Sequence, residues 1–291
     1  MLVVVVLVSI GLPLVGARVF AATDNLFLHA PWSELAPPGV VPTNPLVADT
    51  VDAVLPRWAE VQDRLGTGDF PLWSTLPLGG IPVGSQINSA LLAPMGLPYY
   101  LIPLRHAPAV SKLMELAVAI GFTYLFLRRV GVERPAALFG GLVFAYTGFQ
   151  VAWTNWPQAG VGATIPALLW AVDRLATRPA PHNVAIVAIA TAALVLGGFP
   201  AVAGYGLLVA AIWGLVRASQ RAPEEGIPMV RALLARRVAW LAAAGALGLA
   251  LAAVQLLPFA GWLEVIDTAY REQSARSPLP IESLVALVVP D

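Results

Sequence analysis

The chain carries repeated apolar runs of the length that a helix needs to cross a bilayer. Seven such runs are present, at residues 2–20, 107–127, 135–152, 160–176, 183–198, 200–216 and 238–257. About 20 apolar residues span the hydrocarbon core as a helix, which satisfies its own backbone hydrogen bonds there. Because 58% of the 291 residues are hydrophobic and only 12% are charged, we predict an all-α polytopic membrane protein with about seven transmembrane helices.

Basic residues mark one side of these predicted spans. Arginines occur in alternate connections, namely Arg128, Arg129, Arg134, Arg174, Arg178, Arg217, Arg221, Arg231, Arg236 and Arg237. The intervening connections, at residues 153–159 and near residue 199, carry no charge. Because connections rich in arginine stay in the cytoplasm, we expect the amino terminus inside and the long first loop outside. A cleaved signal peptide is the alternative for residues 2–20, but no basic residue precedes that run.

The expected organisation has four segments. A first transmembrane helix at residues 1–20 precedes an external loop at 21–106, which carries the candidate active site. A six-helix transmembrane region follows at 107–257, and an external segment at 258–291 ends the chain. Because a new apolar stretch begins at Leu284 and stops at Asp291, we expect the sequence to be part of a longer protein.

The external loop is the long polar part of the chain, with seven Asp or Glu and three Arg at residues 21–106. Apolar residues recur in it at helical spacing, at Val51, Val54, Leu55, Trp58, Val61 and Leu65. This pattern predicts an amphipathic helix that lies on the membrane surface and is kinked at Pro56. Residues 87–103 form a second interfacial segment that leads back to the bilayer.

Asp49 and Asp52 are the candidate catalytic residues. An external carboxylate just above the bilayer can act as a general base on a lipid-borne substrate. The alternative is structural, because an acid before a helix and another three residues later also cap its free amides.

Four external arginines are candidates for binding the phosphate of a substrate, because a guanidinium pairs bidentately with phosphate oxygens. They are Arg57, Arg105, Arg271 and Arg276, and Arg64 is a fifth external arginine beside them. The alternative is that they lie among lipid headgroups. Lys112 and Glu115 are charges at bilayer depth, which are functional by default, although their spacing also permits a mutual ion pair.

Asn155 lies between Trp153 and Trp156 in an outer connection. Tryptophan rings with nearby amides are typical of sugar-binding surfaces, although an aromatic belt at the membrane surface is the favoured explanation of the tryptophans. The absence of cysteine excludes thiol chemistry. The three histidines are too scattered to predict a zinc site, and no basic stripe indicates nucleic acid binding.

Several motifs resemble those of bacterial YfhO-like membrane proteins, which belong to the GT-C class of glycosyltransferases. They lie at residues 49–50 (Asp-Thr), 68–73 (Gly-Asp-Phe-Pro-Leu-Trp), 79–82 (Gly-Gly-Ile-Pro), 86–94, 144–149 (Phe-Ala-Tyr-Thr-Gly-Phe), 196–200 (Leu-Gly-Gly-Phe-Pro) and 255–258 (Gln-Leu-Leu-Pro), with Glu264. Family members often carry histidine where this chain has Asn155 and Phe199.

The resemblance implies a GT-C fold in a bacterial inner membrane. It also implies transfer of a sugar from a polyprenyl-phosphate donor to a glycan or lipid acceptor of the cell envelope. Asp49 takes the acid role in this comparison, with Asp52 as its neighbour, and the motifs add Trp73, Asn88 and Glu264 as substrate-binding candidates. The metal requirement is open, and a divalent cation is compatible with the family.

Two other functions are compatible with the sequence. A transporter or flippase of a lipid-linked glycan would use discontinuous helices with charges near the bilayer midplane. A non-catalytic scaffold of envelope assembly would tolerate replacement of both loop acids.

The predicted orientation can be tested by cysteine labelling, because the native chain has no cysteine. A cysteine at Thr67 should react with an impermeant reagent added outside the cell, and a cysteine at Gly226 should react only after permeabilisation. Labelling in the opposite pattern would reject the orientation.

Overall fold

The computed structural model describes residues 10–42, 48–76, 79–220 and 236–267. Most of these residues are helical, and they contain no strand, only an isolated bridge between Ser74 and Ile81. The structure therefore confirms the all-α class.

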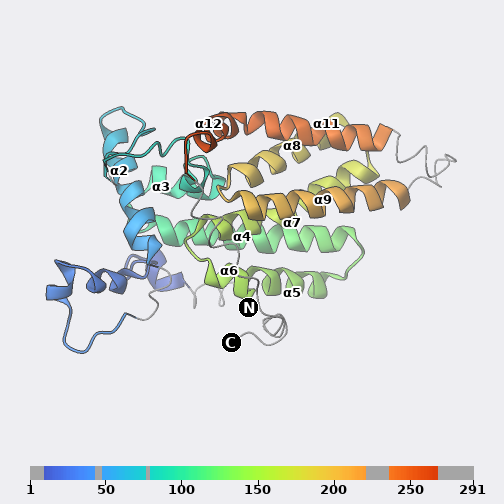
Figure 1. The fold of residues 1–291 in the computed structure, drawn as a ribbon. Helices are drawn as coiled ribbons and strands as arrows, with labels where there is room; N and C mark the ends of the chain where they lie inside the picture. Colours follow the sequence, from blue (N-terminus) through green and yellow to red (C-terminus); the bar gives the residue numbers. More distant parts are fainter. Residues whose placement is uncertain (1–9, 43–47, 77–78, 221–235, 268–291) are drawn as a thin grey trace, which may run out of the picture.

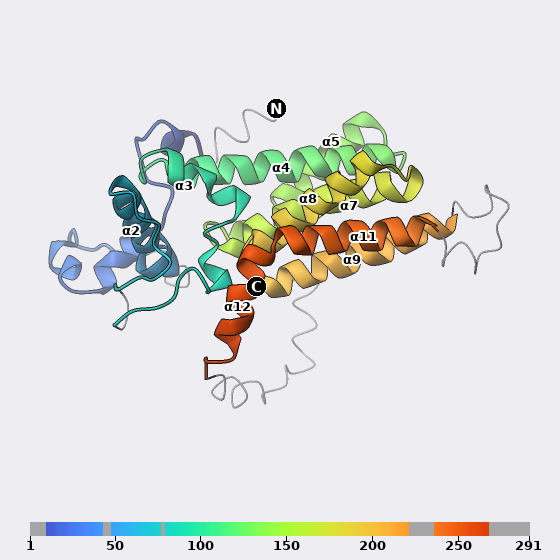
Figure 2. The same cartoon turned by 90° about the horizontal axis from the view of Figure 1, so that it is seen from above.

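The longer helices lie side by side as a bundle (Figures 1 and 2). They are α4 (Ala107–Arg129), α5 (Arg134–Ala145), α7 (Pro157–Thr177), α8 (Pro181–Leu196), α9 (Pro200–Gln220) and α11 (Arg236–Leu251). The short α6 (Gly148–Ala152) follows α5, and α12 (Ala253–Leu263) bends away from α11.

Two helices, α4 and α9, are long and apolar enough to cross a membrane, and the bent pair α11 and α12 would be a third. The apolar helices are those of a membrane protein, but the count of seven spans stays a prediction. The run expected at residues 135–152 is divided into α5 and α6, and α8 has 16 residues. The first eight residues of the first run, 2–9, lie outside the described residues, and residues 10–14 are helical.

The long loop covers one end of this bundle (Figure 1). Its elements are the 3-10 helices η1 (Thr23–Leu28), η2 (Trp32–Leu35), η5 (Ile87–Ser89) and η6 (Pro94–Gly96), the π-helical turn η4 (Thr50–Val54), and the α-helices α2 (Leu55–Gly66) and α3 (Leu97–Leu101).

Helix α2 is amphipathic as predicted, but protein covers its apolar face. Trp58 and Val61 are almost fully buried against Leu91, Tyr99 and Ala107. The expectation that this face rests on the membrane surface is therefore wrong for these two residues, because hydrophobic periodicity identifies a buried face without identifying what covers it.

The expected kink at Pro56 is also absent from the interior of α2. Pro56 lies in the first turn of the helix, where its missing N–H donor is not needed. The turn before it, η4, is π-helical and is closed by the bond from the Leu55 N–H to the Thr50 carbonyl.

A buried ion-pair network stabilises the end of the bundle opposite the loop. Asp173 on α7 is fully buried, and its two oxygens each accept a hydrogen bond of 2.7 Å, one from Arg129 Nε on α4 and one from Arg217 Nε on α9. Arg129 also donates to Thr177. One carboxylate thus joins three helices of the bundle.

We expect Asp173→Asn to lower the free energy of unfolding by about 3 kcal/mol, because removing one partner leaves buried guanidinium groups uncompensated. Asp69→Asn, which removes the exposed ion pair with Arg64, is the matched control and should cost much less, because solvent screens an exposed pair. Denaturation of the purified protein in detergent measures both, and equal losses would contradict a special role of Asp173.

Candidate functional site

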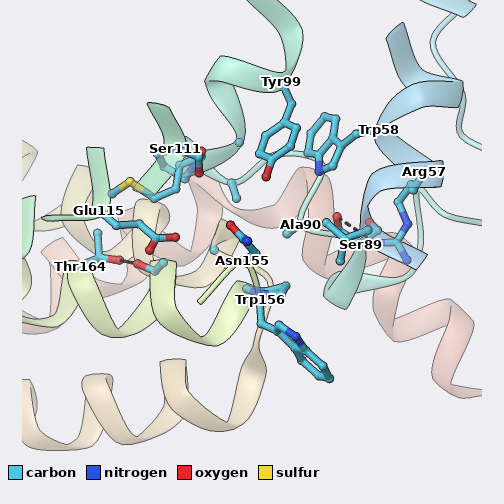
Figure 3. Close-up of a pocket in the computed structure, with 18 of the residues that line it drawn as sticks. Arg57, Trp58, Ser89, Ala90, Tyr99, Ser111, Glu115, Asn155, Trp156 and Thr164 are labelled. Atoms are coloured by element: carbon cyan, nitrogen blue, oxygen red, sulfur yellow. Dashed lines mark hydrogen bonds between the residues drawn. The ribbon is translucent and has the colours of Figure 1, made fainter. Parts of the chain in front are cut away.

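A cavity lies between the long loop and the covered ends of α4, α7 and α8. Its polar and aromatic lining residues are Arg57, Trp58, Ser89, Tyr99, Ser111, Glu115, Asn155, Trp156 and Thr164 (Figure 3). The cavity has a volume of about 60 Å³, which is room for about two water molecules at the density of the liquid. Glu115 and Arg57 lie on opposite sides of it.

Glu115 is part of a buried ion pair within α4. Lys112 Nζ lies 3.1 Å from Glu115 Oε2, and only 8% of each side chain is exposed. Lys112 also donates to the Gln150 carbonyl at 3.0 Å. Within the described residues, hydrogen bonds reach only the Oε2 atom of Glu115, so the pair places a carboxylate at the cavity without adding net charge.

Arg57 is a half-buried cation on α2. Its Nη1 atom lies 3.5 Å from the Ser89 carbonyl, and no carboxylate of the described residues lies within ion-pair distance of it. Burial lowers the pKa of the Arg57 guanidinium, since desolvation disfavours its charge. An anionic ligand would offset this cost, and Arg57 therefore favours phosphate or carboxylate.

Aromatic side chains hold the Arg57 wall in place. The Trp58 ring stacks on Tyr99 at 4.8 Å between centroids and meets Tyr100 edge to face at 5.0 Å. The Tyr100 hydroxyl donates to the Leu91 carbonyl at 2.6 Å. Burial raises the pKa of Tyr99 and raises the pKa of Tyr100 to about 12, so both phenols stay neutral over the physiological range.

The connection before α7 supplies the opposite wall. Asn155 adopts a left-handed backbone conformation with φ of 66°, and its amide donates to the Phe20 carbonyl at 2.7 Å. The buried indole Nε1 of Trp156 has no hydrogen-bond partner in the described part of the chain. An unpaired buried donor is costly, so Trp156 is suited to donate to an acceptor atom of a ligand.

A second, larger cavity lies on the other side of Arg57. It has a volume of about 250 Å³ and is lined by Asp52, Ala53, Pro56, Arg57, Ser74, Leu76, Ile81 and Val83. Asp52 and Arg57 therefore face one space, although they form no direct ion pair. The volume approaches the roughly 300 Å³ at which small-molecule pockets begin.

The predicted site residues are only partly brought together. Arg57 and Asn155 line the inner cavity, and Asp52 and Arg57 line the outer one. Asp49 precedes η4, is exposed, and makes no capping hydrogen bond with its side chain.

The other predicted residues lie outside both cavities. Trp73 is half exposed and its ring packs on Gly80, and Asn88 is exposed. Arg105 donates to His106 at 2.8 Å, and Glu264 is exposed at the end of α12. Arg271 and Arg276 lie outside the described residues.

Other lining residues carried no sequence signal of function. Ser89, Tyr99, Ser111 and Thr164 are common residue types in apolar surroundings, and only the fold brings them together. Glu115 was detectable as a charge inside an apolar run. Among the described residues, no group of three or more metal-ligating His, Asp or Glu side chains forms.

Comparison with protein-family models, curated proteins and solved structures found no match to this chain. The site is therefore interpreted from its own chemistry.

A double-mutant cycle tests the coupling of Lys112 and Glu115. Lys112→Met alone should destabilise the protein strongly, because it leaves a buried carboxylate unpaired. The double variant with Glu115→Gln should recover at least about 1 kcal/mol of that loss. Denaturation in detergent provides the measurement, and additive effects would show that the two charges are not coupled.

Proposed function

We propose that this chain is a membrane glycosyltransferase that moves a sugar from a polyprenyl-phosphate donor to a glycan or lipid acceptor of the cell envelope. The observation that carries the proposal is the outer cavity, in which an exposed carboxylate, Asp52, faces the same space as Arg57. Arg57 is a half-buried cation with no carboxylate partner in the described residues. An acid beside an anion-binding group suits attack by a hydroxyl on a phosphate-linked sugar.

Each group has a defined part in the proposed reaction. The acceptor oxygen attacks the anomeric carbon, the bond from that carbon to the phosphate oxygen breaks, and the polyprenyl phosphate leaves. Arg57 offsets the charge of the departing phosphate. Asp52 takes the hydroxyl proton, which contributes typically 10²- to 10⁴-fold in such reactions.

The inner cavity supports the same function in a different way. Its volume is too small for a whole sugar, but Glu115 offers a carboxylate oxygen that can accept a hydrogen bond from a single hydroxyl group or from water. We therefore place the sugar in the outer cavity. The side of the sugar nearest the inner cavity would contact Arg57, which lines both cavities.

The proposal includes an orientation. Arg128, Arg129, Arg134, Arg174, Arg178, Arg217 and Arg236 lie at the ends of helices away from the long loop (Figure 1). Under the positive-inside rule, that end is cytoplasmic and the cavities face outward. Seven spans of GT-C type and a bacterial inner membrane belong to the same proposal.

A flippase of a lipid-linked glycan is the second candidate, and the bend of 70° between α11 and α12 favours it. Broken helices and buried charges such as Lys112 and Glu115 are features of transport sites. A flippase would move the lipid-linked glycan between leaflets without releasing polyprenyl phosphate.

The experiment follows release of polyprenyl phosphate from a polyprenyl-phosphate sugar by the full chain in liposomes that contain envelope lipids. We expect Asp52→Asn to lower turnover at least about 100-fold, and Arg57→Gln to weaken donor binding about 10-fold or more. Asp49→Asn tests the acid favoured by the family resemblance.

Asp63→Asn is the matched control, because Asp63 is an exposed acid on α2 that lines neither cavity. If Asp49→Asn abolishes turnover and Asp52→Asn does not, the two acids exchange roles. Full activity in both variants, or movement of the donor between leaflets with no release of polyprenyl phosphate, would reject the proposed reaction.

A further inference from the structure

A third polar cavity lies at the end of the bundle opposite the long loop. It has a volume of about 200 Å³ and is lined by Arg129, Arg174, Arg178, His182 and Asn183, from α4, α7 and α8. No carboxylate lines it. The sugar transfer proposed above assigns no role to these residues, because they lie at the end of the helices opposite the long loop.

The charges of this cavity are only partly neutralised within the described residues. Asp173 is shared between Arg129 and Arg217, so one carboxylate serves two guanidinium groups. Arg174 Nε donates to the neutral Asn183 Oδ1 at 3.1 Å. The Arg178 side chain makes no hydrogen bond or ion pair with any of the described residues. Among the described residues, the cavity therefore has a net positive charge that a bound anion would offset.

The positions of these groups are fixed by buried contacts. Asn183 is 2% exposed, and its amide also donates to the Arg178 carbonyl at 2.8 Å, which ties the end of α7 to the first turn of α8. Arg129 is held by Asp173 and Thr177. Such preorganised guanidinium groups suit a phosphate, whose oxygens accept several charge-assisted hydrogen bonds at once.

The surroundings place this cavity at the depth of lipid headgroups. Three arginines at this end lie over tryptophan rings, in the pairs Arg174 with Trp170, Arg217 with Trp213 and Arg236 with Trp240, at 4.8, 5.7 and 5.9 Å. Tryptophan with arginine at helix ends is typical of the membrane interface. Basic pockets between helices at this depth bind anionic headgroups.

We propose that Arg129, Arg174, Arg178, His182 and Asn183 form a binding site for a phosphate group, supplied by the headgroup of an anionic phospholipid or by a soluble phosphate. The site is independent of the sugar transfer proposed above. Its occupant would add an anion where α4, α7 and α8 meet and would hold these helix ends together.

Native mass spectrometry of the full chain in neutral detergent tests this site, with phosphatidylglycerol as the anionic lipid and phosphatidylcholine as the zwitterionic one. We expect wild-type protein to retain phosphatidylglycerol preferentially. Arg178→Gln should weaken its binding about 10-fold, as expected for loss of charge-assisted hydrogen bonds. The Arg178 side chain is exposed and only its backbone is bonded, so this variant should fold.

Arg128→Gln is the matched control. It removes the same charge one residue from Arg129, but Arg128 is exposed, lies outside the cavity and donates only to the Val132 carbonyl. Retained lipid binding in this variant supports the site. An equal loss in both variants would show a general attraction of anions to a basic surface and would overturn the proposal.

Titration with inorganic phosphate separates the two sources. Displacement of phosphatidylglycerol only at high phosphate concentration assigns the site to the lipid. Binding of phosphate that depends on Arg178, with no preference for phosphatidylglycerol, assigns it to a soluble ligand. If neither ligand depends on Arg178 or on His182, tested as His182→Gln, the cavity is not a phosphate site.

Discussion

Close approach of the helices around α7 is the constraint on which the rest of the structure depends. This helix contacts α4, α8, α9 and α11, and its inner residues are small, with Ala159, Ala163 and Ala171 fully buried. Small residues let helix backbones approach and gain packing where lipid supplies no hydrophobic driving force. Gly248 has the same part between α11 and α8, since a Cβ atom there would lie 2.8 Å from the Ala188 carbonyl.

The position of the long loop follows from this packing. Gly198, at the turn between α8 and α9, has φ of +94°, and a Cβ atom on it would lie 2.6 Å from Ala90. Gln255 on α12 donates to the Gly84 carbonyl at 3.1 Å, and Asn155 donates to that of Phe20. The loop thus contacts two connections of the bundle and helix α12, and its cavities lie between these contacts.

Much of the helical framework could be predicted from the sequence, because apolar periodicity and length report burial directly. The boundaries of α4, α7, α8 and α9 agree with the predicted runs within a few residues. The break after Ala145 and the bend between α11 and α12 were not predicted, because each falls inside a continuous apolar run of the sequence. The predicted amphipathic helix is present as α2, but its apolar face packs mainly on other residues of the long loop.

The candidate site was less predictable for a related reason. Asp52 and Arg57 were identifiable as polar residues in an acidic loop, whereas Ser111 and Thr164 gain meaning only from tertiary contacts. Asp49 shows the limit of local patterns, because an aspartate that precedes a helix can have a catalytic role, a capping role or neither. Here its side chain makes no capping bond and lines neither cavity.

The spacing of Lys112 and Glu115 has a consequence for biogenesis. Two isolated charges in the first half of an inserting helix would each cost up to about 3 kcal/mol, the value for the helix centre, yet an i, i+3 pair can form within α4 as soon as that helix forms. The segment can therefore enter the bilayer as a nearly neutral unit before α7 is synthesised. The hydrogen bond from Lys112 to the Gln150 carbonyl forms later, when α6 packs against α4. Until then, the ion pair with Glu115 compensates the charge of Lys112.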